Sequence, residues 1–225
     1  MTTVTAMTTV TTIVMDDTQF LTLTQWLSPA YPVGAFAWSH GLERAVARGD
    51  VADAEEVSQW LAAVLEYGAG RSDAILLCAA YEAEDITPVA DLAAALAPSK
   101  ERRMETMQQG AAFAATTRAV WEIDVPDMAY PVVVGRAAGI VGLALLPVTQ
   151  LWMQAFASNL VQAAQRLLPI GQTEGQRILA RLTPLIRQIS TEATSATIDD
   201  IGTSTFMVDT AAMQHSAQYS RIFRS

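Results

Sequence analysis

Cysteine and histidine are scarce in this chain, which has one cysteine and two histidines among its 225 residues. A single cysteine, Cys78, excludes an intramolecular disulfide, and the apolar run AILLCAA around it favours a buried side chain. A structural metal site of the Cys/His type needs several such ligands at short spacing. We therefore predict no metal site in the isolated chain. A dimer would double His40 and His215, which leaves a weak symmetric histidine site as an open alternative.

Sequence motifs for catalysis and nucleotide binding are also absent. The chain contains neither a GxxxxGK[ST] phosphate loop nor a GxGxxG fingerprint, and nothing in it resembles a nucleophile elbow. Ser39, His40 and Glu43 are the residue types of a Ser–His–acid set, but successive helix positions point in different directions. We therefore expect a chain that binds no cofactor and is not an enzyme.

Basic residues are outnumbered, with 14 Lys and Arg against 23 Asp and Glu and a net charge of −9. An acidic chain without a basic run argues against nucleic acid as a partner. The first fifteen residues contain no Lys or Arg and no long apolar core, so they do not form a secretory signal. We expect a cytoplasmic protein in which residues 1–17, rich in threonine, form a disordered tail.

Charge is absent altogether between Ala137 and Gln165. Although about 20 apolar residues suffice to cross a membrane, Pro147 and recurring polar side chains argue against a span. We predict two helices instead, Pro131 to Leu145 and Pro147 to Leu168, buried on most sides in the core or at a subunit interface. A pocket between these helices, serving a ligand carrier or a small enzyme, is the alternative function.

The rest of the chain favours helices, because alanine and leucine outnumber aromatic and β-branched residues. Cap residues and apolar spacing predict a single all-α domain over residues 18–225, with about eight to ten helices. The remaining expected helices run from Phe20 to Leu27, Ser39 to Gly49, Asp53 to Gly68 or Gly70, Ser72 to Glu84, Thr87 to Leu96, Ser99 to Val120, Gly171 to Thr194 and Thr205 to His215.

Two segments have the composition of binding surfaces. SPAYPVGAFAWSHGLE, from Ser28 to Glu43, has two prolines and a glycine that shape a turn, after which Ser39 is expected to cap a helix. Its aromatic side chains Phe36 and Trp38 must be buried in the fold or in a partner. QYSRIFRS, from Gln218 to Ser225, combines aromatic residues and arginine, the types that dominate binding hot spots. The alternative for this C-terminal segment is packing on its own domain.

Three stretches resemble the UreF family of urease accessory proteins. The first is the segment from Ser28 to Glu43, which is similar to the family's SPALPVGGFSYSQGLE. RLLPIGQTEGQR, from Arg166 to Arg177, resembles RLIPLGQTDGQR, and the C-terminal QYSRIFRS resembles QYSRLFRS. The chain departs from the family at Ala35, Ala37, Trp38 and His40. It also departs after His215, where the family often has His-Glu-Thr-Gln.

The resemblance implies an all-helical, dimeric, non-catalytic protein that takes part in installing nickel in apo-urease. Family members bridge UreD (also called UreH) and the GTPase UreG, and the assembly docks on apo-urease. By resemblance, residues 210–225 become ordered on UreD, while the first segment organises the docking of UreG. The partner-binding residues so predicted are Pro32, Val33, Gly34, Phe36, Ser39, Glu43, Gln172, Gln176, Tyr219, Arg221, Phe223, Arg224 and Ser225.

Overall fold

The computed structural model describes residues 15–224, and these residues form an all-α fold. The predicted fold class is therefore confirmed. Over the described residues there are ten α-helices and two short 3-10 helices: α1 (Asp17–Trp26), η1 (Ala35–Ala37), α2 (Leu42–Arg48), α3 (Ala54–Tyr67), α4 (Ala69–Glu82), α5 (Thr87–Ala95), α6 (Lys100–Trp121), α7 (Tyr130–Ile140), α8 (Leu145–Leu167), α9 (Gln172–Ala193), η2 (Ile198–Asp200) and α10 (Phe206–His215).

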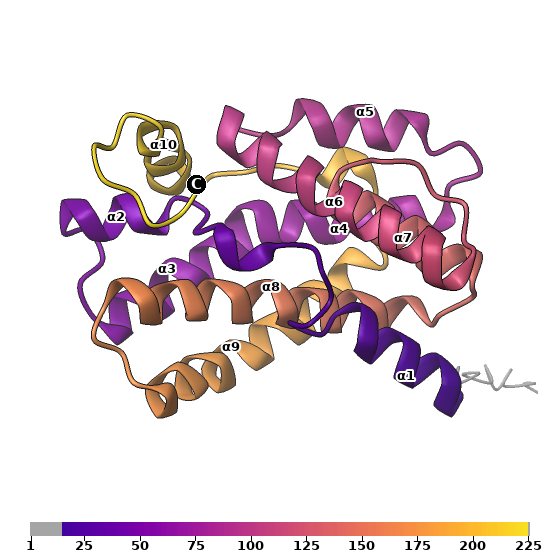
Figure 1. Cartoon of the computed structure of the whole chain (residues 1–225), viewed down its shortest axis with the longest axis horizontal. Helices are drawn as coiled ribbons and strands as arrows, with labels where there is room; N and C mark the ends of the chain where they lie inside the picture. The colour runs from indigo at the N-terminus through magenta and orange to yellow at the C-terminus, as the bar shows by residue number, and fades with distance from the viewer. Residues whose placement is uncertain (1–14, 225) are drawn as a thin grey trace, which may run out of the picture.

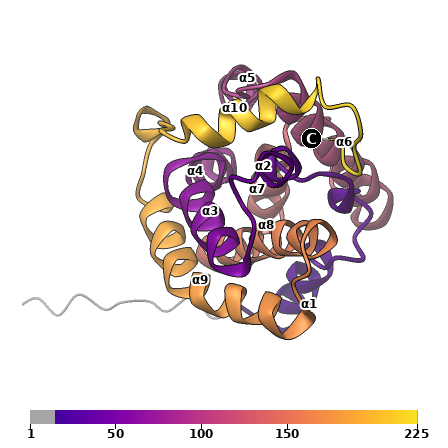
Figure 2. The ribbon, with the colours of Figure 1, turned by 90° about the vertical axis from the view of Figure 1, so that its left-hand side faces the viewer.

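The uncharged stretch forms the middle of the bundle. α7 and α8 lie among α1, α3, α4, α6 and α9, as the end-on view in Figure 2 shows. α7 packs closely on α4, because Gly135 and Gly139 face the backbone carbonyls of Leu77 and Tyr81 and have no side chain to hold the helices apart. Within the described residues, no helix is both long and apolar enough to cross a membrane.

The break between these two helices lies earlier than predicted. α7 ends at Ile140 rather than Leu145, because Gly142 takes a left-handed conformation with φ of 68° and turns the chain. α8 then begins at Leu145, so Pro147 lies in its first turn, where a proline removes no helical hydrogen bond. The predicted interruption at Pro147 was therefore assigned to the wrong residue.

The N-terminal helix begins inside the range predicted as a tail. Asp16 and Gln19 form a reciprocal capping box that starts α1 at Asp17; residues 1–14 of the predicted tail lie outside the described residues. Leu23 and Trp26 are buried as expected. Phe20 and Leu21, also in α1, are exposed.

Other helix starts follow their cap residues. The Asp53 side chain accepts a hydrogen bond from the Glu56 N–H at 2.9 Å and starts α3, and Ser99 accepts from the Arg102 N–H at 3.0 Å and starts α6. α4 begins at Ala69, three residues before the predicted start at Ser72, because Gly68 breaks the chain directly after α3.

The C-terminal end of the chain returns to its N-terminal third. α10 packs on α2 and α6, and the residues after it run back beside α2 and η1 (Figure 1). The region of η1 and α2 and the C-terminal segment therefore lie side by side in space, although nearly the whole sequence of the domain separates them.

The close approach of α4 and α7 gives a stability prediction. A Cβ added at Gly135 would lie 2.1 Å from the Leu77 carbonyl oxygen. Helix propensity favours alanine over glycine by about 1 kcal/mol, but overpacking costs about 1–3 kcal/mol. We therefore expect Gly135→Ala to lower the free energy of unfolding in urea titrations. Gly202→Ala is the control, because a Cβ there meets nothing within 4 Å; equal stability of the two variants would contradict the packing.

Candidate partner-binding site

The loop between α1 and α2, residues 28–41, is held by backbone conformations that favour glycine. Gly34 has φ of 72° and leads into η1, and His40 and Gly41 have φ of 55° and 79° just before α2. Gly41, not Ser39, is therefore the N-cap, and the predicted helix start at Ser39 was early. The Ser39 hydroxyl instead accepts a hydrogen bond from the Glu43 N–H at 3.3 Å.

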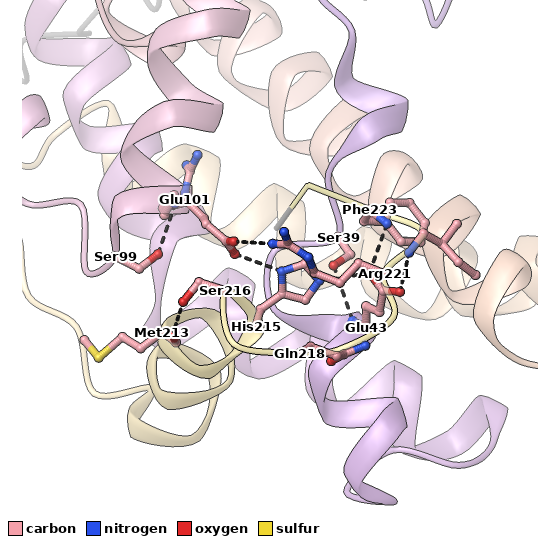
Figure 3. A network of polar contacts seen from close by, with 12 residues as sticks. Ser39, Glu43, Ser99, Glu101, Met213, His215, Ser216, Gln218, Arg221 and Phe223 are labelled. Carbon is pink, nitrogen blue, oxygen red and sulfur yellow. Dashed lines mark hydrogen bonds and ion pairs between the residues drawn. The ribbon is translucent and has the colours of Figure 1, made fainter.

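Glu43, in the first turn of α2, holds the C-terminal segment (Figure 3). Its buried carboxylate accepts hydrogen bonds from the backbone N–H groups of Ile222 at 2.6 Å and Phe223 at 3.0 Å. The same carboxylate contacts Nε2 of His215 at 2.9 Å. Glu43 was predicted as a partner-binding residue, and in the structure its carboxylate lies against the C-terminal segment of its own chain.

His215 lies between two carboxylates. While Nε2 faces Glu43, Nδ1 contacts Oε2 of Glu101 at 2.8 Å, and the imidazole is fully buried. Each ring nitrogen therefore has a carboxylate oxygen within hydrogen-bond distance. Arg221 donates to the other oxygen of Glu101 at 2.9 Å. The result is a buried network that links α2, α6, α10 and the C-terminal segment, as Figure 3 shows.

Opposing effects set the ionisation of Glu43. Burial alone would raise the pKa of its carboxyl. The hydrogen bonds from His215 and from the two backbone N–H groups outweigh that effect, and the pKa of Glu43 lies below its ordinary value of 4.5. The carboxylate is therefore charged at neutral pH, which is the form that accepts three hydrogen bonds.

A second buried ionic cluster lies beside the first. Arg102 of α6 pairs with Asp73 of α4 and lies 3.7 Å from Glu105, and Glu105 lies 3.8 Å from Nδ1 of His40. Burial disfavours the guanidinium charge, but the attraction of Asp73 and Glu105 prevails and raises the pKa of Arg102. Arg102, in the first turn of α6, therefore has acidic neighbours within its own chain.

The C-terminal segment packs on its own domain, the arrangement that the sequence left as the alternative. Phe223 is buried, and the Arg166 guanidinium lies over its ring at 4.2 Å. The N–H of Arg224 donates to the Ala37 carbonyl oxygen at 2.9 Å, and Arg166 donates to the Phe36 carbonyl oxygen at 2.7 Å. The three stretches that carry the family resemblance therefore meet at this point.

The predicted partner-binding residues divide into an exposed and a buried group. Ser39, Glu43 and Phe223 are buried and hold the fold together. Ser225 lies outside the described residues. Val33 and Gly34 are partly exposed, and the remaining residues are exposed: Pro32, Phe36, Gln172, Gln176, Tyr219, Arg221 and Arg224. Gln172 and Gln176 lie in the first turns of α9, where Gln172 accepts a hydrogen bond from Gln165 at 3.4 Å.

Large apolar side chains near the C-terminal segment point to solvent. Tyr219 is fully exposed, Ile222 is 60% exposed and Phe36 is 74% exposed. Phe206 and Met207, at the other end of α10, are also exposed, by 80% and 63%. Tyr31 and Trp38, by contrast, are buried, so Phe36 is the aromatic side chain of the loop that is left for a partner.

A hollow of about 480 Å³ opens beside the loop. Residues of the loop, including Val33 and Phe36, line one side, and α8 lines the other with Leu151, Gln154 and Asn159. The described residues contain no group of three or more His, Cys, Asp or Glu side chains placed to hold a metal ion.

The fold and the site together define a class: an all-α protein whose exposed aromatic and arginine side chains are of the types that bind other proteins. A sequence model of the UreF family matches residues 51–183. The urease accessory protein UreF of Roseobacter denitrificans is 51% identical over 215 residues, which cover 95% of this chain and 97% of that protein. The protein of the same name from Cereibacter sphaeroides is 53% identical over 205 residues, 91% of this chain and 98% of its own.

The chain belongs to the UreF family of urease accessory proteins. This confirms the predicted family. It also confirms that the chain is not an enzyme, because members of the family are named accessory proteins of urease and are non-catalytic. Membership implies interaction with partners in the maturation of urease.

The network around Glu43 gives a pH-dependent prediction. A carboxyl whose pKa is lowered by folding stabilises the fold fully above its unfolded value of 4.5, and the contribution is lost as the pH falls through the lower folded value. Glu43→Gln removes the charge and should cost about 1.5–3 kcal/mol at neutral pH. Urea titrations of both proteins at several pH values should show this difference shrinking below pH 4.5; a difference independent of pH would contradict the assignment.

Proposed function

We propose that this protein acts in nickel incorporation into apo-urease by bridging UreD (UreH) and the GTPase UreG in the cytoplasm, as a homodimer formed through its helices. Family membership and the exposed side chains around the C-terminal segment support this proposal. The chain supplies binding surfaces, and the GTP hydrolysis that accompanies metallocentre assembly takes place in UreG.

The observation that carries the proposal is the exposed C-terminal surface, which we define as Tyr219, Arg221 and Ile222. Its backbone is already fixed by Glu43, so a partner that binds there does not bear the full cost of ordering the segment. Aromatic side chains and arginine on a fixed backbone have the character of a binding hot spot. We assign this surface to UreD.

Removal of the C-terminal segment tests this assignment. A chain without residues 218–225 should fail to capture UreD in a pull-down. Tyr219→Ala is the sharper variant, because the side chain is fully exposed and its removal leaves the fold intact. A hot-spot residue contributes about 2 kcal/mol or more to binding, so we expect at least a 30-fold weaker affinity for UreD by calorimetry.

Met213→Ala is a matched control for loss of an exposed apolar side chain, since Met213 lies on α10 but outside the defined surface. Unchanged affinity for UreD in Tyr219→Ala, at unchanged thermal stability, would count against the assignment.

The second surface is the exposed part of the loop, Pro32, Val33, Gly34 and Phe36, which borders the hollow against α8. We assign this loop to the docking of UreG. It lies close to the C-terminal surface, because the Arg224 N–H bonds to Ala37, so one chain is able to hold both partners at neighbouring positions.

Gly34 provides the test of the loop. Its φ of 72° is a strained conformation for a β-branched residue, although a Cβ at this position would meet nothing within 4 Å. Gly34→Val should therefore distort the loop and reduce urease activation in cells that carry the urease genes. Gly34→Asn is the control, since asparagine tolerates this conformation. Full urease activity with the valine variant would refute the role of the loop.

A ligand pocket between the uncharged helices remains the alternative function. The hollow that would hold such a ligand lies between the loop and α8 rather than between α7 and α8, and its lining residues are uncharged. An apolar molecule that copurifies with the protein and is displaced by Leu151→Trp would favour this alternative.

A further inference from the structure

Arg166, near the C-terminal end of α8, contacts the loop and the C-terminal segment at the same time. Its Nη1 donates a hydrogen bond to the Phe36 carbonyl oxygen at 2.7 Å. Its Cζ lies 4.2 Å from the centroid of the Phe223 ring. One guanidinium therefore joins two segments that are almost 190 positions apart in the sequence.

The shape of a guanidinium allows both contacts together. It is planar, so its edge donates hydrogen bonds while its face stacks on an aromatic ring. A lysine ammonium retains the charge but has no such plane. The arrangement at Arg166 thus depends on the shape of the side chain as well as on its charge.

The backbone of Phe223 is held by Glu43, which accepts the hydrogen bond of its N–H. The ring is buried, and Arg166 contacts both that ring and the loop. The loop itself is a short turn, closed by hydrogen bonds from the Ala37 N–H to Gly34 and from the Trp38 N–H to Ala35, both at 3.2 Å.

We propose that Arg166 is a positioning residue that makes the conformation of residues 34–38 depend on the seating of the Phe223 ring. When the ring is seated, Arg166 is held against the Phe36 carbonyl and Phe36 faces solvent in a fixed orientation. When the ring is removed, Arg166 loses its stacking partner and the turn is less restrained. The consequence for partners, namely that the Arg166 contact holds the loop ready for docking, rests on the function proposed above.

Amide hydrogen exchange on the full chain tests the link without any partner. The readouts are the amides of Ala37 and Trp38, which report the turn. We expect Arg166→Gln to speed their exchange about tenfold, the scale set by one hydrogen bond to a charged group. Arg166→Lys should behave like the glutamine variant. Normal exchange at these amides in Arg166→Gln would overturn the proposal, and so would complete rescue by lysine.

A double-mutant cycle tests whether the ring acts through Arg166. Phe223→Leu removes the ring but leaves the backbone hydrogen bonds to Glu43 and Ala37 available. In the native background it should speed exchange at Ala37 and Trp38, and in the Arg166→Gln background it should have no further effect. Equal effects in both backgrounds would show that Arg166 does not carry the coupling.

Arg177→Gln is the matched control. Arg177 is an exposed arginine of the same charge that pairs with Glu174 at 2.8 Å, within α9 and outside this contact. Hydrogen exchange at residues 34–38 in the Arg177→Gln variant should equal that in the native chain. Thermal unfolding of each variant shows whether the whole fold is destabilised. Faster exchange confined to residues 34–38 supports the link, and a uniform loss of protection along the chain contradicts it.

A partner experiment keeps the two proposals distinguishable. Recruitment of UreG to the complex of this chain with UreD should fall at least tenfold for Arg166→Gln, the same factor expected for exchange at the turn, while capture of UreD stays normal. If exchange shows the coupling but UreG binds equally well, the assignment of UreG to the loop fails and the link inside the chain stands. If exchange shows no coupling, the link itself fails.

Discussion

The buried carboxylate of Glu43 is the interaction on which the arrangement of this site depends. It accepts two backbone N–H groups of the C-terminal segment and faces the imidazole of His215. A buried charge is costly unless every hydrogen-bonding position is satisfied, and here three donors from α10 and the C-terminal segment satisfy it. Glu43 therefore fixes the position of the backbone of the C-terminal segment, and that position determines where the aromatic and arginine side chains of the segment lie.

Helix content and most helix boundaries could be predicted, because their signals are local. Asp53 and Ser99 start their helices as N-caps. The end of α7 was misplaced, since Pro147 is the stronger local signal but Gly142 makes the turn. The Glu43–His215–Glu101 network was not predictable, because its members come from three distant segments and each one alone is typical of a solvated charge. For the same reason the sequence could not tell that Trp38 is buried and Phe36 exposed, a choice made by packing against α8 and the C-terminal segment.

The site also explains why a non-catalytic family member needs so many buried polar groups. Two ionic clusters, one around Glu43 and one around Arg102, fix α2, α4, α6 and α10 relative to one another. Replacing such clusters by apolar side chains often does not lower stability, so their value lies in specifying one arrangement. In this chain that arrangement sets the position of the loop relative to the C-terminal segment, the two surfaces assigned to different partners.

Hydrogen exchange at the Ile222 and Phe223 amides of the isolated chain, followed residue by residue at neutral pH, shows whether Glu43 holds the C-terminal segment. The account predicts that both amides exchange as slowly as the amides in the middle of α2, because Glu43 accepts their hydrogens in the absence of any partner. Exchange at the rate of an exposed peptide would contradict it, since the C-terminal segment would then not be held by Glu43 before a partner binds.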